Sequence, residues 1–180
     1  MVLLKYIMVL SFTAAVSFAF AQTSSQTTDS SDCFKEEERM VRGSSMVPLV
    51  NPGDTIKILV GYYDCHPVER GDIVAYKYYG NKNPVIKMVK GIPGDEFHIE
   101  KNDGEALIHI NGEPVKNSEN IPYRLNAKAC KMLSLYEQDY NGTIPESTYL
   151  LLGNQADNSV DSRRFGLIDK RDIIGKVRLK

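Results

Sequence analysis

Turn-forming residues punctuate this chain so densely that its secondary-structure elements must be short. Glycine, proline, asparagine and aspartate favour turns because each supplies either a special backbone conformation or a local side-chain hydrogen bond. From Val47 onward they cluster at Asn51–Asp54, Glu69–Asp72, Gly80–Pro84, Gly91–Asp95, Asn102–Gly104 and Asn111–Glu113. Long helices cannot form between such clusters, whereas short strands can.

The runs between the clusters are rich in β-branched and aromatic residues, which favour strands. We predict strands at Thr55–Val60, Ile73–Tyr79, Val85–Lys90, Phe97–Lys101, Ala106–Ile110, Tyr149–Leu152 and Ile173–Leu179. The sequence "LIHINGEPV" predicts a hairpin in which Asn111-Gly112 forms a type I′ turn. Short strands at this spacing are typical of a mainly β protein, an antiparallel sandwich or barrel.

One segment departs from the strand pattern. Asn117–Glu146 has the poorest strand signal of the body, and within it Ala127–Glu137 is able to form one short helix. We interpret residues 117–146 as a small insertion or lid on the β core. With 180 residues, of which 42% are hydrophobic, the rest of the chain is sufficient for one domain, which we assign to residues 38–180.

The N-terminal residues 1–21 are apolar apart from Lys5. The uncharged run that starts at Tyr6 is shorter than the ~20 residues that cross a bilayer, and Ala19-Phe20-Ala21 has the form of a secretory cleavage site. If Lys5 extends toward the membrane interface, the whole segment reaches spanning length. Both a membrane anchor and a cleaved signal peptide therefore fit these residues.

A polar stretch separates this segment from the domain. Gln22–Asp32 has no large apolar residue and cannot offset its own ordering entropy, so we interpret residues 22–37 as a flexible tether. The charged run Phe34–Arg42 leads into the domain as either a short helix or a first strand.

Charge and cysteine content limit the partners. The 22 basic and 23 acidic residues nearly cancel, which disfavours a nucleic-acid partner. Cys33, Cys65 and Cys130 show no CxxC or Cys/His spacing, so we expect no metal and no cofactor. At most one pair can close: Cys65 with Cys130 is one possibility, with Cys33 left in the tether, and unpaired thiols are the other.

A reactive serine needs a base to remove its proton, and histidine or a neutral lysine can serve. His66, His98 and His109 do not form an acid-His-Ser pattern, and no GxSxG motif is present. We interpret these histidines as ordinary surface or half-buried residues.

Lys87 is the better candidate base. In "NPVIKMVKGIPGD" the alternation of a strand places Val85, Lys87 and Val89 on one face. Burial of that face would lower the pKa of the lysine, as a base requires. The alternative is an edge strand whose lysine amine lies in solvent.

Four stretches, taken in order, carry a family resemblance. "GSSMVPLVNPGD", "ERGDIVAY", "VIKMVKGIPGD" and "LLGNQADNSVDSRRFGLIDKRDIIGKV" resemble the conserved boxes of the type I signal peptidases. These are serine-lysine membrane proteases that remove signal peptides from exported proteins. The resemblance runs from Gly43 to Val177, interrupted chiefly by Asn117–Glu146. It implies a β-rich catalytic domain of the signal peptidase/LexA-like type, preprotein signal peptides as substrates and membrane lipid as a partner.

The resemblance also implies site residues. The Ser-Met-x-Pro box places the nucleophile on Ser45, and the Lys-x-x-x-Gly-x-Pro-Gly-Asp box places the base on Lys87. In the last box, Ser159 matches a serine that hydrogen-bonds the lysine amine. Asp161 and Arg163 match a charged pair that shapes the site.

The chain departs from the family pattern at several positions. Gly43 stands where a Ser or Thr hydroxyl often completes the oxyanion hole, although the mitochondrial inner-membrane branch is similar in carrying Gly there. The hole then relies on the Ser45 backbone N–H and on a second donor that the sequence does not identify. Gly153-Asn154-Gln155-Ala156 replaces a common Gly-Asp-Asn-Arg, and Met88 replaces a basic residue.

We therefore expect an endopeptidase that removes N-terminal signal peptides, held in the cell membrane by one N-terminal span with its catalytic domain outside the cytoplasm. The alternative location is a secreted protein released by cleavage after Ala21. Alternative functions are a pilin-processing or conjugation-associated peptidase, a self-cleaving LexA-like protein, or a catalytically dead secreted domain that binds peptides.

Overall fold

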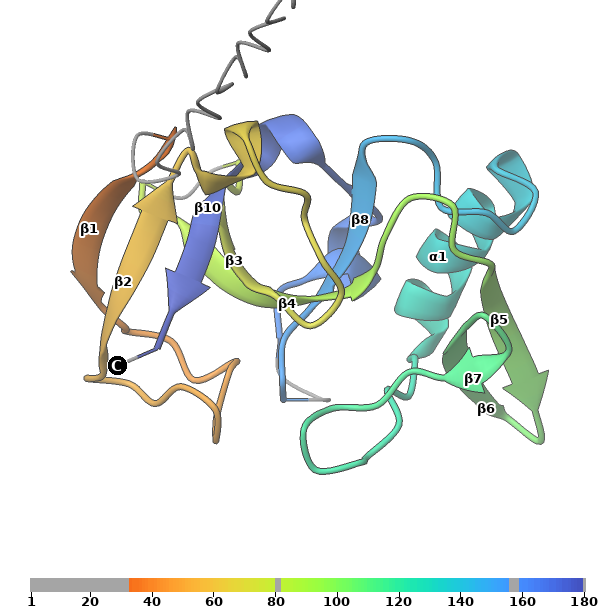
Figure 1. The fold of residues 1–180 in the computed structure, drawn as a ribbon. Coiled ribbons are helices and arrows are strands. Elements are labelled where there is room, and N and C mark those ends of the chain that lie inside the picture. The colour runs from red at the N-terminus through yellow and green to blue at the C-terminus, as the bar shows by residue number, and fades with distance from the viewer. Residues whose placement is uncertain (1–32, 80–81, 156–158, 180) are drawn as a thin grey trace, which may run out of the picture.

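The computed structural model describes residues 33–79, 82–155 and 159–179, which form two antiparallel sheets (Figure 1). The larger sheet contains, in spatial order, β1 (Lys35–Met40), β2 (Thr55–Val60), β10 (Ile173–Arg178), β3 (Ile73–Tyr76), β4 (Val85–Gly91), β8 (Thr148–Leu152) and β9 (Ile168–Asp169). The smaller sheet contains β5 (Phe97–Asn102), β6 (Glu105–Ile110) and β7 (Glu113–Pro114). The helices are α1 (Ala127–Asp139) and α2 (Ser162–Phe165), with 3₁₀ turns η2 (Tyr62–Asp64) and η3 (Lys170–Asp172). The expectation of a mainly β, antiparallel fold is confirmed.

Each predicted strand is present, with ends that differ by a few residues. The largest difference is at Ile73–Tyr79, because β3 stops at Tyr76 and the Lys77 N–H donates to Asp172 O in η3 at 2.7 Å. The predicted hairpin turn is confirmed, since Asn111 and Gly112 both have positive φ, at 52° and 81°. The predicted helix is confirmed as α1, which begins at Ala127 after the capping side chain of Asn126.

Of the two forms considered for residues 34–42, the structure shows the strand. β1 pairs with β2 from Lys35↔Val60 to Met40↔Thr55. Ion pairs favour this placement of β1, because Glu36 pairs with Lys57 on β2 at 2.7 Å and with Arg178 on β10 at 2.9 Å. Charged side chains on an edge strand also discourage pairing with a second molecule.

The β1–β2 pairing corrects the cysteine prediction. Cys33 lies just before β1 and Cys65 just after η2, and the antiparallel pairing brings these ends together as a Cys33–Cys65 disulfide with Cα atoms 6.2 Å apart. Cys130 lies in α1 as a free thiol, packed against the core of the smaller sheet. A Cys65–Cys130 pair is therefore wrong, and so is the prediction that all three thiols are unpaired.

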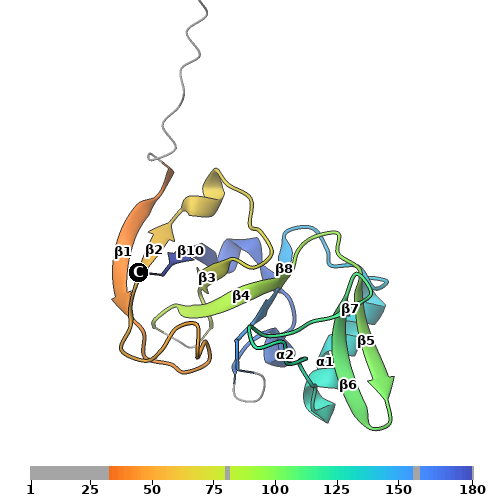
Figure 2. The ribbon, with the colours of Figure 1, turned by 60° about the horizontal axis from the view of Figure 1, so that its bottom comes forward.

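Residues 117–146 pack against the smaller sheet. Leu133 of α1 and Ile144 share a buried core with Phe97 of β5 and Ile108 of β6. Both ribbon views show α1 beside β5 and β6 (Figures 1 and 2). The segment therefore supplies five of the thirteen buried residues that the structure describes in this core, and its action as a lid remains a prediction.

Two further core clusters lie on the larger sheet, and the one that holds the connection between β1 and β2 matters most for function. It contains Val41, Met46 and Val50 from the connection between β1 and β2, packed against residues of β2, β3 and β10. This connection is held to the sheet by apolar side chains on both sides of its polar turn. The turn itself carries Ser45.

Nothing in residues 33–79, 82–155 and 159–179 forms a helix with the length and hydropathy needed to cross a membrane. The proposed anchor or signal peptide at residues 1–21 lies outside the described residues, as does most of the tether.

We predict that removing the disulfide destabilises the domain. It closes a loop with a sequence separation of 32 residues, so loss of this constraint on the unfolded chain should lower the free energy of unfolding by about 3 kcal/mol. Urea unfolding of the Cys33→Ser/Cys65→Ser double variant, followed by circular dichroism, measures the change. Cys130→Ser is the matched control and should unfold within about 1 kcal/mol of wild type. Equal stability of the double variant and wild type would contradict the prediction.

Candidate active site

Ser45 lies on a short turn whose backbone is fixed from both sides. Val47 N donates to Ser44 O at 3.1 Å, and Gln155 N, after β8, donates to Ser45 O at 3.0 Å. Met46, the next residue, is buried in the core cluster that this connection forms with β2, β3 and β10. Because its neighbours are anchored, the Ser45 side chain has a defined direction at the edge of the core.

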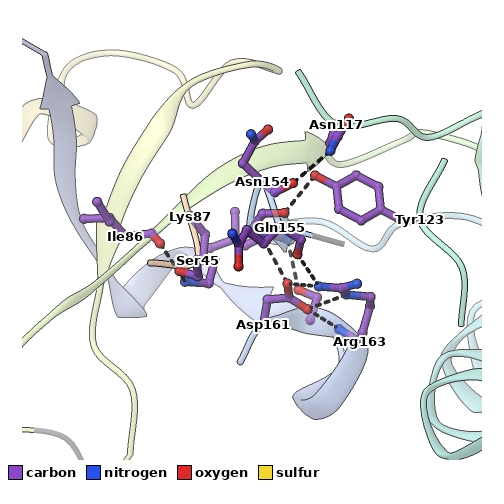
Figure 3. A network of polar contacts seen from close by, with 12 residues as sticks. Ser45, Ile86, Lys87, Asn117, Tyr123, Asn154, Gln155, Asp161 and Arg163 are labelled. Atoms are coloured by element: carbon purple, nitrogen blue, oxygen red, sulfur yellow. Dashed lines mark hydrogen bonds and ion pairs between the residues drawn. The ribbon is translucent and has the colours of Figure 1, made fainter. Parts of the chain in front are cut away.

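Lys87 points at this serine from β4. Its Nζ atom lies 2.7 Å from Ser45 Oγ and 2.8 Å from Ile86 O (Figure 3). The side chain is only 2% exposed, and Lys87, Val89 and Gly91 form the buried face of the strand. The predicted alternation is confirmed, and the alternative of a lysine amine in solvent is wrong.

Burial changes the chemistry of Lys87. Desolvation lowers the pKa of its ammonium group to about 8 and is the dominant effect, while Asp161 opposes it and Arg163 assists it. A lysine with this pKa is partly neutral near neutral pH. A neutral amine 2.7 Å from a hydroxyl is able to take its proton.

Asp161 and Arg163 form a buried ion pair beneath the site, as the resemblance implies. The Asp161 carboxylate accepts from Arg163 Nη2 at 2.8 Å and from Arg163 Nε at 3.0 Å. It also caps α2 and accepts from Gly153 N at 2.9 Å. The pair therefore links α2 rigidly to the end of β8, beside Lys87.

Ser159 does not make the hydrogen bond expected for it. Its hydroxyl is buried without a hydrogen-bond partner in the described parts of the chain. It lies against Gly153, where an added Cβ would collide with the Ser159 side chain and come within 2.9 Å of Ser45 O. Ser159 thus packs against Gly153, near the Ser45 carbonyl, and the structure does not show the hydrogen bond to Lys87 that the resemblance implies.

A groove of about 310 Å³ opens beside Ser45 and Lys87. Its walls are mainly apolar, and the whole lining is Arg39, Met40, Val41, Arg42, Gly43, Ser45, Ile56, Ile58, Asn83, Pro84, Val85, Ile86 and Lys87. Two strand edges border it: β1 is the last strand of its sheet, and β8 pairs with β4 only from Met88 onward. The first residues of β4 therefore have one edge without a strand partner, which suits an extended peptide.

Gly43 and Ser45, the two residues that the oxyanion prediction concerns, both line the groove. A Cβ on Gly43 would meet no atom within 4 Å, so the absent hydroxyl leaves open space. The Ser45 N–H donates to no acceptor in the part of the chain that the structure describes. This N–H is available to bind an oxyanion.

Sequence reasoning missed a set of polar residues that pack against the turn at Ser44–Val47, which carries Ser45 and is called the nucleophile turn below (Figure 3). Tyr123 OH donates to Gly153 O at 2.8 Å, and Asn117 Nδ2 donates to Asn154 O at 3.1 Å. The Asn154 side chain donates to Val47 O at 2.9 Å. The only sequence signal was the altered Gly153-Asn154-Gln155-Ala156 box, which indicated lost charges and said nothing of partners.

The histidines lie elsewhere. His66 stacks on Tyr62 with ring centroids 4.1 Å apart, and His98 Nδ1 lies 2.6 Å from the Glu137 carboxylate. His109 is on β6 of the smaller sheet. Within the residues that the structure describes, no three His, Cys, Asp or Glu side chains gather to hold a metal ion.

Known proteins are similar in sequence to this chain. A family model described as "Signal peptidase, peptidase S26" matches residues 3–180. Signal peptidase IB of Staphylococcus aureus (strain COL) is 31% identical over 149 residues, which cover 78% of this chain and 74% of that protein. Signal peptidase I of Bacillus caldolyticus is 30% identical over 141 residues, covering 77% and 75%.

A crystal structure of a signal peptidase I from Enterococcus faecalis V583 superposes with a TM-score of 0.44 and 26% identity, over 62% of this chain and 97% of that one. The sequence matches carry the assignment by themselves, since both the family model and the curated relatives span most of the chain. They agree with the Ser45–Lys87 geometry: this chain belongs to the signal peptidase family, peptidase S26.

Proposed function

We propose that this protein is a serine endopeptidase that removes N-terminal signal peptides from exported preproteins, with Ser45 as nucleophile and Lys87 as general base. The observation that carries the proposal is the 2.7 Å contact between Lys87 Nζ and Ser45 Oγ, made by a buried lysine at the wall of an apolar groove. Family membership supports the same substrate class.

The geometry supports an acyl-enzyme mechanism. Neutral Lys87 takes the proton of the Ser45 hydroxyl while Oγ attacks the scissile carbonyl. The resulting oxyanion accepts a hydrogen bond from the Ser45 backbone N–H. The Lys87 ammonium then donates its proton to the leaving amine as the C–N bond breaks. Water, deprotonated in turn by Lys87, attacks the acyl-enzyme ester, and the proton returns to Ser45 as it departs. Ile86 O holds the lysine amine in place by its 2.8 Å hydrogen bond.

The groove supports an extended substrate. Its apolar walls fit the small apolar residues at the end of a signal peptide, and the unpaired edge at the start of β4 offers backbone hydrogen bonds beside Lys87. A catalytically dead peptide-binding domain would not need a buried lysine in contact with its serine. The dyad geometry therefore favours the peptidase over that alternative.

We also propose that residues 1–21 anchor the protein in the cell membrane, with the catalytic domain outside the cytoplasm. The Cys33–Cys65 disulfide supports the extracytoplasmic side, because disulfides persist in oxidising compartments. An anchored protease also meets precursors as they emerge from the bilayer, whereas a released one would be diluted away from them.

The dyad predicts a sharp contrast between two lysines of β4. Ser45→Ala and Lys87→Ala should each lower kcat for preprotein cleavage by about a thousandfold or more, because each removes a reacting group. Lys90→Ala is the matched control: burial also lowers the pKa of Lys90, but its Nζ donates to Lys116 O at 2.7 Å and lies outside the dyad. Lys90→Ala and Ser44→Ala should retain most activity. An active Lys87→Ala with an inactive Lys90→Ala would assign the base to the other lysine.

The pKa of Lys87 predicts the pH dependence. Below that pKa the amine is protonated and cannot accept the serine proton, so kcat/KM should rise about tenfold per pH unit in the acidic range. The rise should level off above the pKa, which burial lowers to about 8. Initial rates on a fluorogenic peptide from pH 5 to pH 10 measure the profile. A rate that peaks in acid and declines above neutrality would contradict a lysine base.

Membrane attachment predicts the fate of the N-terminus. The mature protein should sediment with membranes, resist extraction by carbonate and begin at or near Met1. Fractionation followed by N-terminal sequencing tests this. A soluble mature protein that begins at Gln22 would show that residues 1–21 are a cleaved signal peptide.

A further inference from the structure

Asn154 is a buried amide whose polar atoms all have partners. It is 1% exposed, and it follows Gly153 at the end of β8. Its Nδ2 atom donates to Val47 O and to Ser118 Oγ, both at 2.9 Å, and its Oδ1 atom accepts from Ser118 N at 2.9 Å. One side chain thus joins the nucleophile turn to the segment that follows β7.

The backbone beside Asn154 makes matching contacts. Gln155 N donates to Ser45 O at 3.0 Å, so residues 154 and 155 hold the carbonyls on both sides of Met46. On the opposite side, Asn117 Nδ2 donates to Asn154 O at 3.1 Å and Tyr123 OH donates to Gly153 O at 2.8 Å. Residues 154 and 155 therefore hold the nucleophile turn, and side chains from residues 117–123 hold the backbone of residues 153 and 154 from the other side.

The distance between Ser45 Oγ and Lys87 Nζ is critical for the proposed reaction. The Ser45 hydroxyl must stay within hydrogen-bond reach of Lys87 Nζ, and a displacement of about 1 Å between reacting groups is able to lower a rate about a hundredfold. Lys87 is fixed by β4 and by Ile86 O, whereas the turn that carries Ser45 lies between strands. Only contacts to the turn itself can fix the other half of the dyad.

We infer that Asn154 is a positioning residue for Ser45, acting through the Val47 carbonyl to hold the nucleophile turn against residues 117–123. This inference rests on the proposed peptidase function. Asn154 does not line the groove, so it acts on the dyad and leaves peptide binding to other residues.

In this chain, where Asn154 replaces the common Asp of the family box, Val47 O receives its side-chain hydrogen bond from the amide, which a carboxylate could not donate. An aspartate at this position has the same shape but presents an acceptor oxygen to a carbonyl, which replaces attraction by repulsion. A buried carboxyl group in such a place has a raised pKa, and its protonated form is again able to donate to Val47 O.

Asn154→Asp in the full-length protein tests the inference. We expect kcat for preprotein cleavage to fall about thirtyfold, with KM within about twofold of wild type. The ratio of wild-type to variant kcat should widen as pH rises, because the variant loses its donor when its carboxyl ionises. Circular dichroism at each pH confirms that the variant is folded where rates are compared.

Asn111→Asp is the matched control. Asn111 Nδ2 donates to Asp95 Oδ1 at 3.0 Å, so this change also sets a carboxylate against an acceptor, but in the β6–β7 turn. It should lower stability and leave kcat of the folded enzyme unchanged. Ser118→Ala, at an exposed position, is a milder second variant that folds readily; it removes one bond that orients the Asn154 amide and should lower kcat about threefold without changing KM.

The outcomes separate this inference from the function on which it rests. If wild type fails to cleave, or Ser45→Ala cleaves normally, the proposed function fails. If wild type is active, Ser45→Ala is dead, and folded Asn154→Asp has wild-type kcat at every pH, the positioning role is overturned. Should Asn154→Asp fail to fold, an unchanged kcat in Ser118→Ala overturns it, and the threefold loss supports it.

Discussion

The chemistry that this structure supports depends on the burial of one lysine amine, that of Lys87. Taking the Lys87 ammonium out of water is unfavourable, and its pKa falls to about 8 as a result. A nearby unpaired carboxylate would reverse the effect, because it stabilises the charged form. Asp161 lies near Lys87 but is paired with Arg163 at 2.8 Å, and the two charges shift the pKa of Lys87 in opposite directions. The ion pair therefore supports the site rigidly, and its two opposite charges largely offset each other in their effect on the pKa of Lys87.

The curvature of the larger sheet brings the two halves of the dyad together. Ser45 follows β1 and Lys87 lies on β4, with β2, β10 and β3 between these strands in the sheet. In Figure 2 the sheet bends so that the connection after β1 faces β4. Apolar residues before and after Ser45 bury themselves in the core formed with β2, β3 and β10. The hydrophobic effect thus fixes the turn only approximately, and hydrogen bonds from residues 154 and 155 supply the remaining precision.

Local rules in the sequence predicted the features that depend on neighbours along the chain. Alternation placed Lys87 on the buried face of its strand, and Asn111-Gly112 marked a hairpin, because both follow from backbone geometry over a few residues. The Cys33–Cys65 pair was missed because it depends on which strand pairs with β1. Asn154 was missed for the same reason: its partners Val47 and Ser118 are 107 and 36 residues away, and no local pattern encodes them. Local rules also gave no means to test the Ser159 contact with Lys87 that the resemblance implied, and the described residues do not make it.

The unpaired edge at the start of β4 links the fold to catalysis. An exposed strand edge is a liability, which the charged residues of β1 reduce at one side of the sheet. At β4 the free edge is short, because β8 joins only from Met88 onward, and it ends at Lys87, the proposed base. A substrate strand that pairs there both satisfies the edge and covers the groove in which Lys87 lies. The lysine is already buried without a substrate, at 2% exposed, so the desolvation that lowers its pKa comes from the fold itself. Under the proposed function, a substrate that pairs with this edge therefore meets a lysine that is already prepared as a base, and the edge serves to place its scissile carbonyl beside Ser45.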